Sequence, residues 1–269
     1  MGNRRLAVRV GSNIAYALLA VASVRADIGT STPLIYSAAS IVNAASQTAN
    51  ALAPNTIATV YGQNLAYDTY GLTSSDLTGG TMPITLKGVS VLVRGFPASM
   101  FYVSPGQINF LIPYELTAGN ANVIVARQGT AGPTVTIQLN PTAPSFFESG
   151  PATPVAVHLD GRLVTSNAPA KAGEVILLYA GGLGRTSPDT STGRIASFAA
   201  PIQAAAQLQI LLNGKAAPPG SIAYAGLAPG FAGLYQINLV VPSGLPPNPE
   251  IRISIGQQIS PPLVLLPLQ

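Results

Sequence analysis

Residues 88–113 read GVSVLVRGFPASMFYVSPGQINFLIP, and this stretch decides the fold class of the chain. Valine recurs at every second position from 89 to 93, which is the period of a half-buried β-strand. Arg94-Gly95 supplies a tight turn into residues 98–103, so a hairpin is expected there. Residues 107–112 predict a further strand, which ends at Pro113 because proline has no N–H for a sheet ladder. The stretch therefore predicts antiparallel β-structure.

Three segments of the chain occur twice, in the same order. The pairs are IATVYGQNL (57–65) and VILLYAGGL (175–183), VSVLVRGFPA (89–98) and LQILLNGKAA (208–217), and QINFLIP (107–113) and QINLVVP (236–242). Ordered self-similarity of this kind indicates two copies of one structural plan. Further strands are expected at residues 123–127, 134–139, 251–255 and 263–266, and a hairpin on Asp160-Gly161 within residues 158–163.

The composition agrees with an all-β fold. The 269 residues include 27 glycines and 24 prolines, and only 8% are charged. Many short strands joined by glycine and proline turns are typical of β-sandwiches. We expect two tandem immunoglobulin-like β-sandwich domains, residues 27–142 and 143–269. They would meet near residues 140–151, where proline and glycine cluster.

Residues 1–26 predict a secretory signal peptide. A basic start with Arg4, Arg5 and Arg9 precedes an apolar run over residues 14–24, and Val24-Arg25-Ala26 before Asp27 fits the small-residue pattern of a cleavage site. Spanning a bilayer takes about 20 apolar residues, so a cleaved signal is favoured over an uncleaved anchor. We expect a secreted protein, periplasmic or extracellular, with no transmembrane segment in the mature chain.

Charge and cysteine content exclude several functions. Four of the 13 basic residues and none of the nine acidic residues lie in residues 1–26, so residues 27–269 carry nine of each. A neutral chain without basic clusters has little power to neutralise phosphates, so no nucleic-acid partner is expected. The absence of cysteine excludes disulfides, thiolate metal sites and cysteine nucleophiles. No cofactor is expected.

Several long motifs in order resemble a known family. They are IVNAASQTANALAPNTIATVYGQNL, then residues 88–113, then AKAGEVILLYAGGLG and IAYAGLAPGFAGLYQINLVVP, and they cover most of residues 40–269. Together they resemble the uncharacterised C-terminal domain family described from Solibacter and other acidobacterial secreted proteins. The GQNL and AGGLG segments are also distantly similar to immunoglobulin-like domains of the IPT/TIG type. The resemblance implies a tandem β-sandwich in an exported bacterial protein and implies no activity.

Two sets of residues are candidates for ligand binding. Tyr67 and Tyr70 fall in a polar segment, residues 66–80, and tyrosines in loops on a rigid sandwich are a common recognition device. The alternative is that they pack onto their own domain. The second set is the amides of the repeated QIN motif, Gln107, Asn109, Gln236 and Asn238. These amides would either bind sugar hydroxyls or serve a structural role, tying neighbouring loops through backbone groups.

The sequence offers no recognisable catalytic frame. His158 is the single histidine and is expected to be a strand residue beside the Asp160-Gly161 turn. No serine lies in a Gly-x-Ser-x-Gly elbow, and no metal site is expected. Asp68, Asp76 and Asp189 lie in loops rich in serine, threonine and glycine, where a weak calcium site is the alternative to solvated carboxylates.

These observations favour a non-catalytic secreted or cell-envelope module for adhesion or for binding carbohydrate or another envelope component. The alternative is a structural module that docks a protein partner or assembles with itself, for example through the apolar segment 263–266. A hydrolase with a site built from loops is the third hypothesis, since a fold does not exclude a function.

Overall fold

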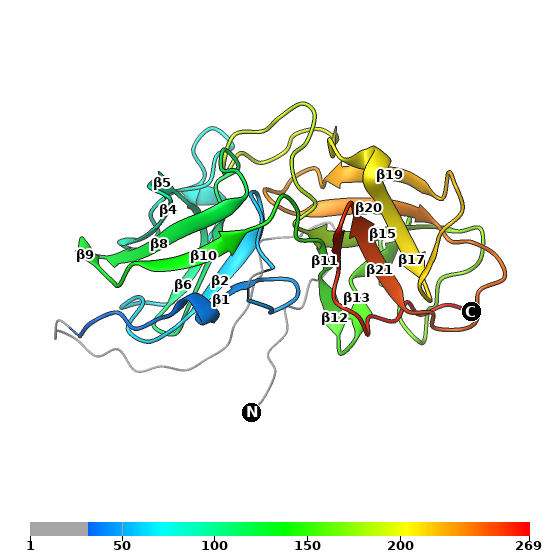
Figure 1. Ribbon diagram of the computed structural model, residues 1–269, viewed down its shortest axis with the longest axis horizontal. Helices are drawn as coiled ribbons and strands as arrows, with labels where there is room; N and C mark the ends of the chain where they lie inside the picture. The colour runs from blue at the N-terminus through cyan, green and yellow to red at the C-terminus, as the bar shows by residue number, and fades with distance from the viewer. Residues whose placement is uncertain (1–31, 50) are drawn as a thin grey trace.

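The computed structural model describes residues 32–49 and 51–269, and the predicted signal peptide lies outside these residues. Two groups of β-sheets lie side by side, one in each half of the chain (Figure 1). The helical elements in this part of the chain are short 3-10 turns at Ala38–Ser40, Ser74–Asp76 and Ala205–Gln207. The all-β prediction is confirmed. No helix among the described residues is long and apolar enough to cross a membrane.

The first half consists of two facing antiparallel sheets. One has the order β1-β2-β7-β6-β3, with β1 Ile41–Asn43, β2 Ile57–Tyr61, β7 Gln107–Leu111, β6 Ser99–Ser104 and β3 Tyr70–Gly71. The other has the order β10-β8-β4-β5, with β10 Val135–Leu139, β8 Gly119–Arg127, β4 Val89–Val93 and β5 Phe96–Pro97; β9 Thr130–Ala131 pairs with β8. The core between the sheets draws on residues 34–139.

The second half has corresponding sheets. One has the order β11-β15-β20-β19-β16, with β11 Ser145–Phe146, β15 Val175–Gly181, β20 Tyr235–Val240, β19 Ile222–Leu227 and β16 Ala200–Pro201; β14 Ala156–His158 also pairs with β15. The other has the order β18-β17-β21-β22, with β18 Lys215–Ala216, β17 Leu208–Leu212, β21 Ile251–Ile255 and β22 Gln258–Ile259. A separate hairpin joins β12 Glu148–Gly150 to β13 Thr153–Pro154. The core of this half draws on residues 146–268.

Each repeated motif occupies corresponding strands in the two halves. The first pair forms β2 and β15, the second forms the hairpins β4-β5 and β17-β18, and the QIN pair forms β7 and β20. Within each half, the QIN strand pairs with the strand of the first motif. The two cores divide between Leu139 and Phe146, while the domain limits 27–142 and 143–269 stay a prediction.

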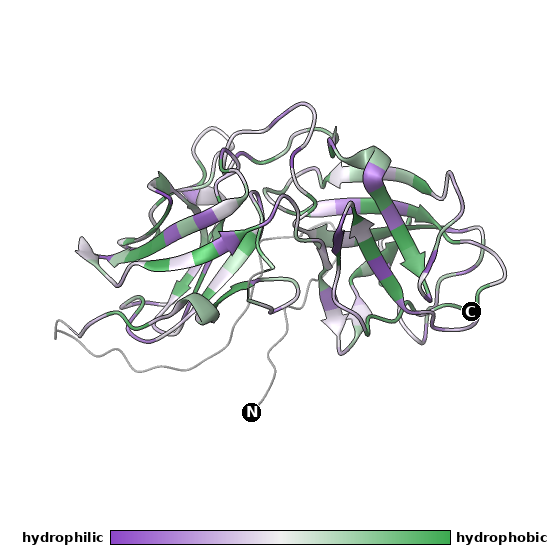
Figure 2. Ribbon diagram, in the orientation of Figure 1, coloured by the Kyte–Doolittle hydropathy of each residue, from purple (hydrophilic) through white to green (hydrophobic). Residues whose placement is uncertain are grey.

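Alternation along the strands explains why the sheets face each other. Val89, Val91 and Val93 are fully buried, whereas Ser90 and Leu92 between them point outward. Figure 2 shows the same banding of hydrophobic and hydrophilic residues along β8, β17 and β21. A period of two places one residue set in the core and the other on the open face of the sheet.

One expected strand is wrong. Residues 263–266 form no strand, and Leu265 makes only an isolated bridge to Glu250. Leu263 has a φ of 72°, which interrupts extended backbone at that point. The buried side chains of Val264 and Leu266 still complete the core of the second half.

The two halves share a third apolar cluster, here called the junction cluster. Its buried members are Ala44, Ala45, Ile57, Leu72, Met82, Phe101, Tyr102 and Leu111 from the first half with Phe147, Val155 and Ala232 from the second. A loop of the second half also crosses to the first: the Met82 N–H donates to the Gly193 carbonyl at 3.0 Å, and the Ile195 N–H to the Gly80 carbonyl at 2.9 Å. The halves therefore contact each other through buried apolar surface as well as backbone bonds.

Candidate functional site

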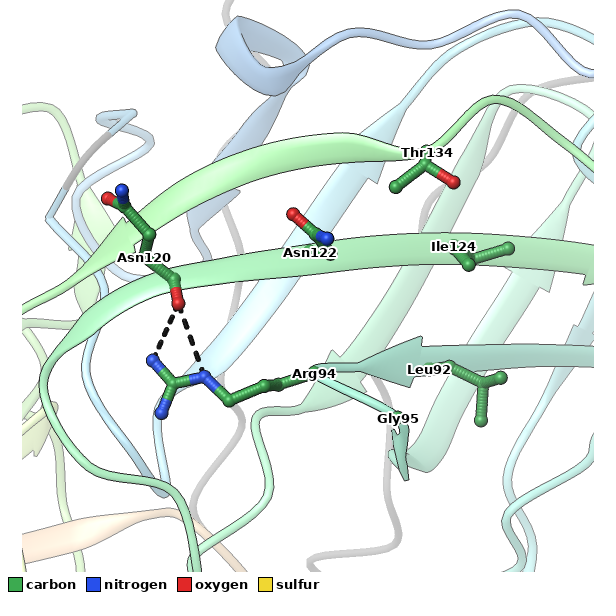
Figure 3. Close-up of a pocket in the computed structure, with 7 residues that line it drawn as sticks. All are labelled: Leu92, Arg94, Gly95, Asn120, Asn122, Ile124 and Thr134. Carbon is green, nitrogen blue, oxygen red and sulfur yellow. Dashed lines mark hydrogen bonds between the residues drawn. The ribbon is translucent and has the colours of Figure 1, made fainter.

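The outer face of the β10-β8-β4-β5 sheet carries a hollow of about 560 Å³, here called the β8 groove. Its lining is Leu92, Arg94, Gly95, Asn120, Asn122, Ile124 and Thr134. Figure 3 shows these side chains on three neighbouring chain segments, with Asn120, Asn122 and Ile124 along β8. The groove thus lies on the sheet face that does not pack into the core.

The pleat of β8 places its polar side chains in the groove. Ala121, Val123 and Val125 point into the core, so Asn122 and Ile124 point to the opposite face. Leu92 on β4 lies directly across from Ile124, and both are apolar. Because Leu92 is 37% exposed, this pair forms an accessible apolar floor.

The Arg94-Gly95 turn closes one end of the groove. Arg94 has a φ of 51° and Gly95 a φ of 80°, the left-handed pair that a two-residue hairpin turn requires. The Arg94 Nη2 and Nε donate to the Asn120 carbonyl at 2.6 and 3.2 Å (Figure 3). Its Nη1 reaches the Thr117 carbonyl at 3.4 Å. These bonds hold the guanidinium beside the amides of β8.

The groove combines an apolar floor with planar polar groups. The Thr136 hydroxyl on β10 donates to Asn122 Oδ1 at 2.9 Å, which leaves the Asn122 Nδ2 group as a donor. Asn120 contributes a second exposed amide. Arg94 is the one lining residue with a formal charge, and the lining contains no carboxylate. Such a surface is suited to binding a polar, ring-shaped ligand rather than to proton transfer.

The QIN amides are arranged differently in the two halves. Gln107 Nε2 donates to Asn109 Oδ1 at 2.9 Å, and Gln236 Nε2 donates to Asn238 Oδ1 at 2.7 Å. In the first half, the Thr59 hydroxyl donates to the same Asn109 oxygen at 3.1 Å. The bonds between these side chains run within the sheet, and no loop is tied by them.

Tyr67 and Tyr70 each lie against a cation of their own half. The Arg127 guanidinium lies 4.2 Å from the Tyr67 ring centroid, and Lys87 Nζ lies 4.4 Å from that of Tyr70. Tyr70 belongs to β3, and its hydroxyl donates to the Asp76 carboxylate at 3.2 Å. Tyr67 is 42% exposed, so part of its ring stays accessible. As ligand-binding residues both stay a prediction.

The His158 side chain links β14 to the loop that contains Ala168 and Glu174. It lies in β14, as expected of a strand residue, and its Nδ1 bonds the Glu174 carboxylate while its Nε2 lies 3.1 Å from the Ala168 carbonyl. The Glu174 hydrogen bond raises the pKa of His158, against the opposing effect of burial. Both ring nitrogens face acceptor oxygens, an arrangement that suits the protonated ring.

Two of the three loop carboxylates, Asp76 and Asp189, have protein partners, whereas Asp68 is exposed. Asp76 Oδ2 accepts bonds from the Thr73 N–H and hydroxyl, each at 2.7 Å, and these bonds lower the pKa of Asp76. Asp189 accepts from Arg185 at 2.5 Å and from Gln203 at 2.9 Å. Within the described residues, no three His, Asp or Glu side chains are grouped so that they could hold a metal ion.

Comparisons with known proteins leave the family open. No family model matches the chain, and no curated protein matches its sequence, so the resemblance to the Solibacter-type family stays a prediction. The structure is similar to the Bacteroides ovatus surface glycan-binding protein SGBP-B of a mixed-linkage glucan utilization locus, with 9% identity and a TM-score of 0.32 over 82% of this chain and 42% of that one.

Other solved structures are similarly distant. Prevotella bryantii PbSGBP-B, a surface glycan-binding protein, has 13% identity and a TM-score of 0.27 over 85% of this chain and 41% of that one. Domains 5–6 of the S-layer protein SbsC have 11% identity and a TM-score of 0.24 over 87% of this chain and 98% of that one. The chain spans less than half the length of the two glycan-binding proteins. At these values the similarity assigns no ligand to this chain.

Sequence reasoning missed the β8 groove. Its residues come from β4, the following turn, β8 and Thr134 just before β10, so no single segment of the sequence contains the whole set. The available signal was the alternation in residues 119–127, which puts Asn120, Asn122 and Ile124 on the outward side.

Proposed function

We propose that this chain is a non-catalytic secreted or cell-envelope module that binds polysaccharide. The observation that carries the proposal is the β8 groove, an open hollow with an apolar floor and amide, hydroxyl and guanidinium groups around it. The groove lies on a sheet face, where a long polymer can pass without entering a closed cavity.

The chemistry of the groove matches that of a sugar. A pyranose ring has apolar C–H faces and an equatorial belt of hydroxyls, each able to donate and accept. Leu92 and Ile124 offer contact to the C–H face, and Asn120 and Asn122 offer both donors and acceptors to the hydroxyls. The groove lining contains neither histidine nor carboxylate that could take or give a proton during hydrolysis.

The test is a depletion isotherm of the purified protein on cellulose, chitin, starch granules and peptidoglycan. We expect saturable binding to one material. The Leu92→Ala/Asn122→Ala variant should then bind about tenfold more weakly. Leu211→Ala is the matched control, because Leu211 occupies the corresponding position on β17 but faces Arg252. Native protein that binds none of the materials, or groove variants that bind as the native protein does, would contradict the proposal.

A second candidate function is docking of another protein chain or self-assembly. Leu263 and Leu265 are 74% and 44% exposed, although Val264 between them and Leu266 after them are buried. Light scattering at high protein concentration tests self-assembly, since an apolar contact of this kind predicts a mass above that of the monomer. A strict monomer at all concentrations would leave only docking of a different protein.

A further inference from the structure

The outer face of the β15-β20-β19 sheet combines aromatic rings with free amide groups. It presents Leu177 and Tyr179 from β15, Gln236 and Asn238 from β20, and Tyr224 from β19, here called the Tyr224 face. Tyr179 lies at the edge of this face, where it packs against the junction cluster. The register places Tyr179 opposite Gln236, and both Leu177 and Tyr224 opposite Asn238. All five side chains are half-buried, and none is charged.

The ring of Tyr224 lies across its own strand. A Cβ added to Gly226 would lie 2.3 Å from the Tyr224 hydroxyl oxygen, 2.3 Å from the Ala200 carbonyl oxygen of β16 and 2.7 Å from Tyr224 Cζ, so the hydroxyl end of the ring and the neighbouring strand fill the space above this glycine. The hydroxyl donates to the Leu227 carbonyl at 2.9 Å, which holds the ring down. Gly226 in turn lies opposite Gln236. The anchored end of the Tyr224 ring therefore lies next to the position across from Gln236.

The amides of this face keep hydrogen-bonding capacity that their counterparts have lost. In the first half, Asn109 is 1% exposed, and its oxygen accepts from both Gln107 and Thr59. In the second half, Leu177 stands where Thr59 stands in the first, and a leucine side chain donates no bond. Asn238 is half-buried, and its side-chain partner among the described residues is Gln236. The Asn238 Nδ2 and the Gln236 Oε1 thus stay open to a ligand.

The counterpart of Tyr224 is also covered. Tyr102 lies opposite Asn109 as Tyr224 lies opposite Asn238, but Tyr102 is 6% exposed and belongs to the junction cluster. The same pattern of residues therefore serves the contact between halves in one copy and is left accessible in the other.

We propose that the Tyr224 face is a second sugar-binding site, specific for a neutral polysaccharide. The Tyr224 ring stacks on the C–H face of one sugar unit, while Gln236 and Asn238 bind its hydroxyls. A neutral ligand is expected because the face carries no charge to pair with a uronate or sulfate. The ligand class rests on the proposed function, whereas the site is separate from the β8 groove.

Two sites on one chain predict stronger binding to long polymers than to short ones. A polymer that reaches both sites binds the second at a high effective concentration, because the junction cluster fixes the halves relative to each other. Short oligosaccharides occupy the sites one at a time and show no such gain.

The test is titration calorimetry of the full chain with four soluble neutral polysaccharides (a β-glucan, a xylan, a mannan and a galactan) and with polygalacturonate. For the neutral polymer that binds, we expect Tyr224→Ala to weaken binding about tenfold and Gln236→Ala about fivefold. Gln107→Ala, the matched amide of the first half, should stay within about twofold of native. Tyr224→Phe keeps the stacking ring but loses its bond to the Leu227 carbonyl, so its affinity should fall between those of the native protein and Tyr224→Ala.

The outcomes separate the two proposals. Neutral-polymer binding that is lost in the groove variant but unchanged in Tyr224→Ala and Gln236→Ala overturns the second site and leaves the proposed function standing. Binding of polygalacturonate alone also overturns it. Native protein that binds no polymer overturns both. If circular dichroism shows that Tyr224→Ala is unfolded, the affinities of Gln236→Ala and Gln107→Ala for the neutral polymer are compared instead. Equal affinities of these two variants overturn the second site.

Discussion

Asn55 in the first half donates a hydrogen bond from Nδ2 to the hydroxyl of Tyr235 in the second half, 2.8 Å away and fully buried. The Tyr235 hydroxyl donates in turn to the Gly184 carbonyl. Burial raises the pKa of Tyr235, so the phenol stays protonated and keeps this donor. The pair joins two segments 180 residues apart in the chain. The contact between the halves therefore contains a satisfied polar link inside an apolar cluster.

Tyr235→Phe should destabilise the protein by roughly 1–3 kcal/mol. The substitution keeps the ring but leaves the Asn55 amide and the Gly184 carbonyl without their buried partner, and buried unsatisfied groups cost about that much. Urea unfolding followed by circular dichroism measures the change. Tyr61→Phe is the control, because the Tyr61 hydroxyl bonds Gln47 on an exposed surface. Equal losses in the two variants would contradict the role assigned to burial.

Gly233→Ala should weaken the contact between the halves. A Cβ at this position would lie 2.3 Å from Leu111 Cδ1 and 3.2 Å from Ile57 Cγ1, both in the first half, and φ is 68°. Overpacking of this kind costs roughly 1–3 kcal/mol. Gly220→Ala is the matched control, since its φ is 83° but no atom of the described residues lies within 4 Å of the added Cβ. The difference between the two unfolding free energies isolates the packing effect. Equal free energies would show that Leu111 and Ile57 move aside from the added Cβ without a cost in stability.

Stability should fall as pH rises through the range where His158 loses its proton. The Glu174 hydrogen bond raises the folded-state pKa of His158 above its ordinary value of 6.5, which the unfolded chain keeps. The stabilisation is therefore complete below pH 6.5 and is lost as pH rises through the folded-state pKa. We expect a loss of about 1.5 kcal/mol, at the low end for a charged hydrogen bond because Glu174 is partly exposed.

Thermal unfolding of the native protein and of His158→Asn between pH 5 and pH 9 measures this dependence. The difference between the two proteins should be largest at the acidic end. Asp160 and Arg162 form an exposed pair beside the histidine and are unchanged in the variant, so their effect cancels. A pH profile that is the same in both proteins would remove His158 as its cause.

Tyr67→Ala/Tyr70→Ala tests the loop against the groove as the place where polysaccharide binds. We expect this variant to keep most of the binding and to lose stability, because each ring already packs against a cation of its own half. Each such contact contributes roughly 0.5–1 kcal/mol at an exposed site. A depletion isotherm and a thermal midpoint are measured on the same sample. Lost binding with an unchanged midpoint would assign recognition to these tyrosines instead.

Some features of the candidate sites could be predicted from a few consecutive residues, whereas others depend on residues that are distant in the sequence. The Arg94-Gly95 turn was predicted because a two-residue turn between alternating segments has few alternatives. The predicted hairpin partner, residues 98–103, was wrong: β4 pairs with β5 Phe96–Pro97, and β6 Ser99–Ser104 belongs to the facing sheet. The hydrogen bond between the Gln and Asn side chains of each QIN motif was not predicted. These two residues are two apart on a strand, so they face the same side of the sheet and meet each other there. Whether such an amide stays free depends on Thr59 or Leu177 across the sheet, far away in sequence.

The sequence by itself determined most of the longer strands, their inward faces and the order of the repeated motifs, because a period of two and glycine-proline turns act over a few residues. Only the tertiary structure decided which copy of the repeated tyrosine and amides is buried in the junction cluster and which stays accessible. It also decided that residues 263–266 pack without forming a strand and that three chain segments enclose the β8 groove. The physical reason is that burial and hydrogen-bond partners on a sheet come from neighbouring strands and from the other half, which local periodicity does not encode.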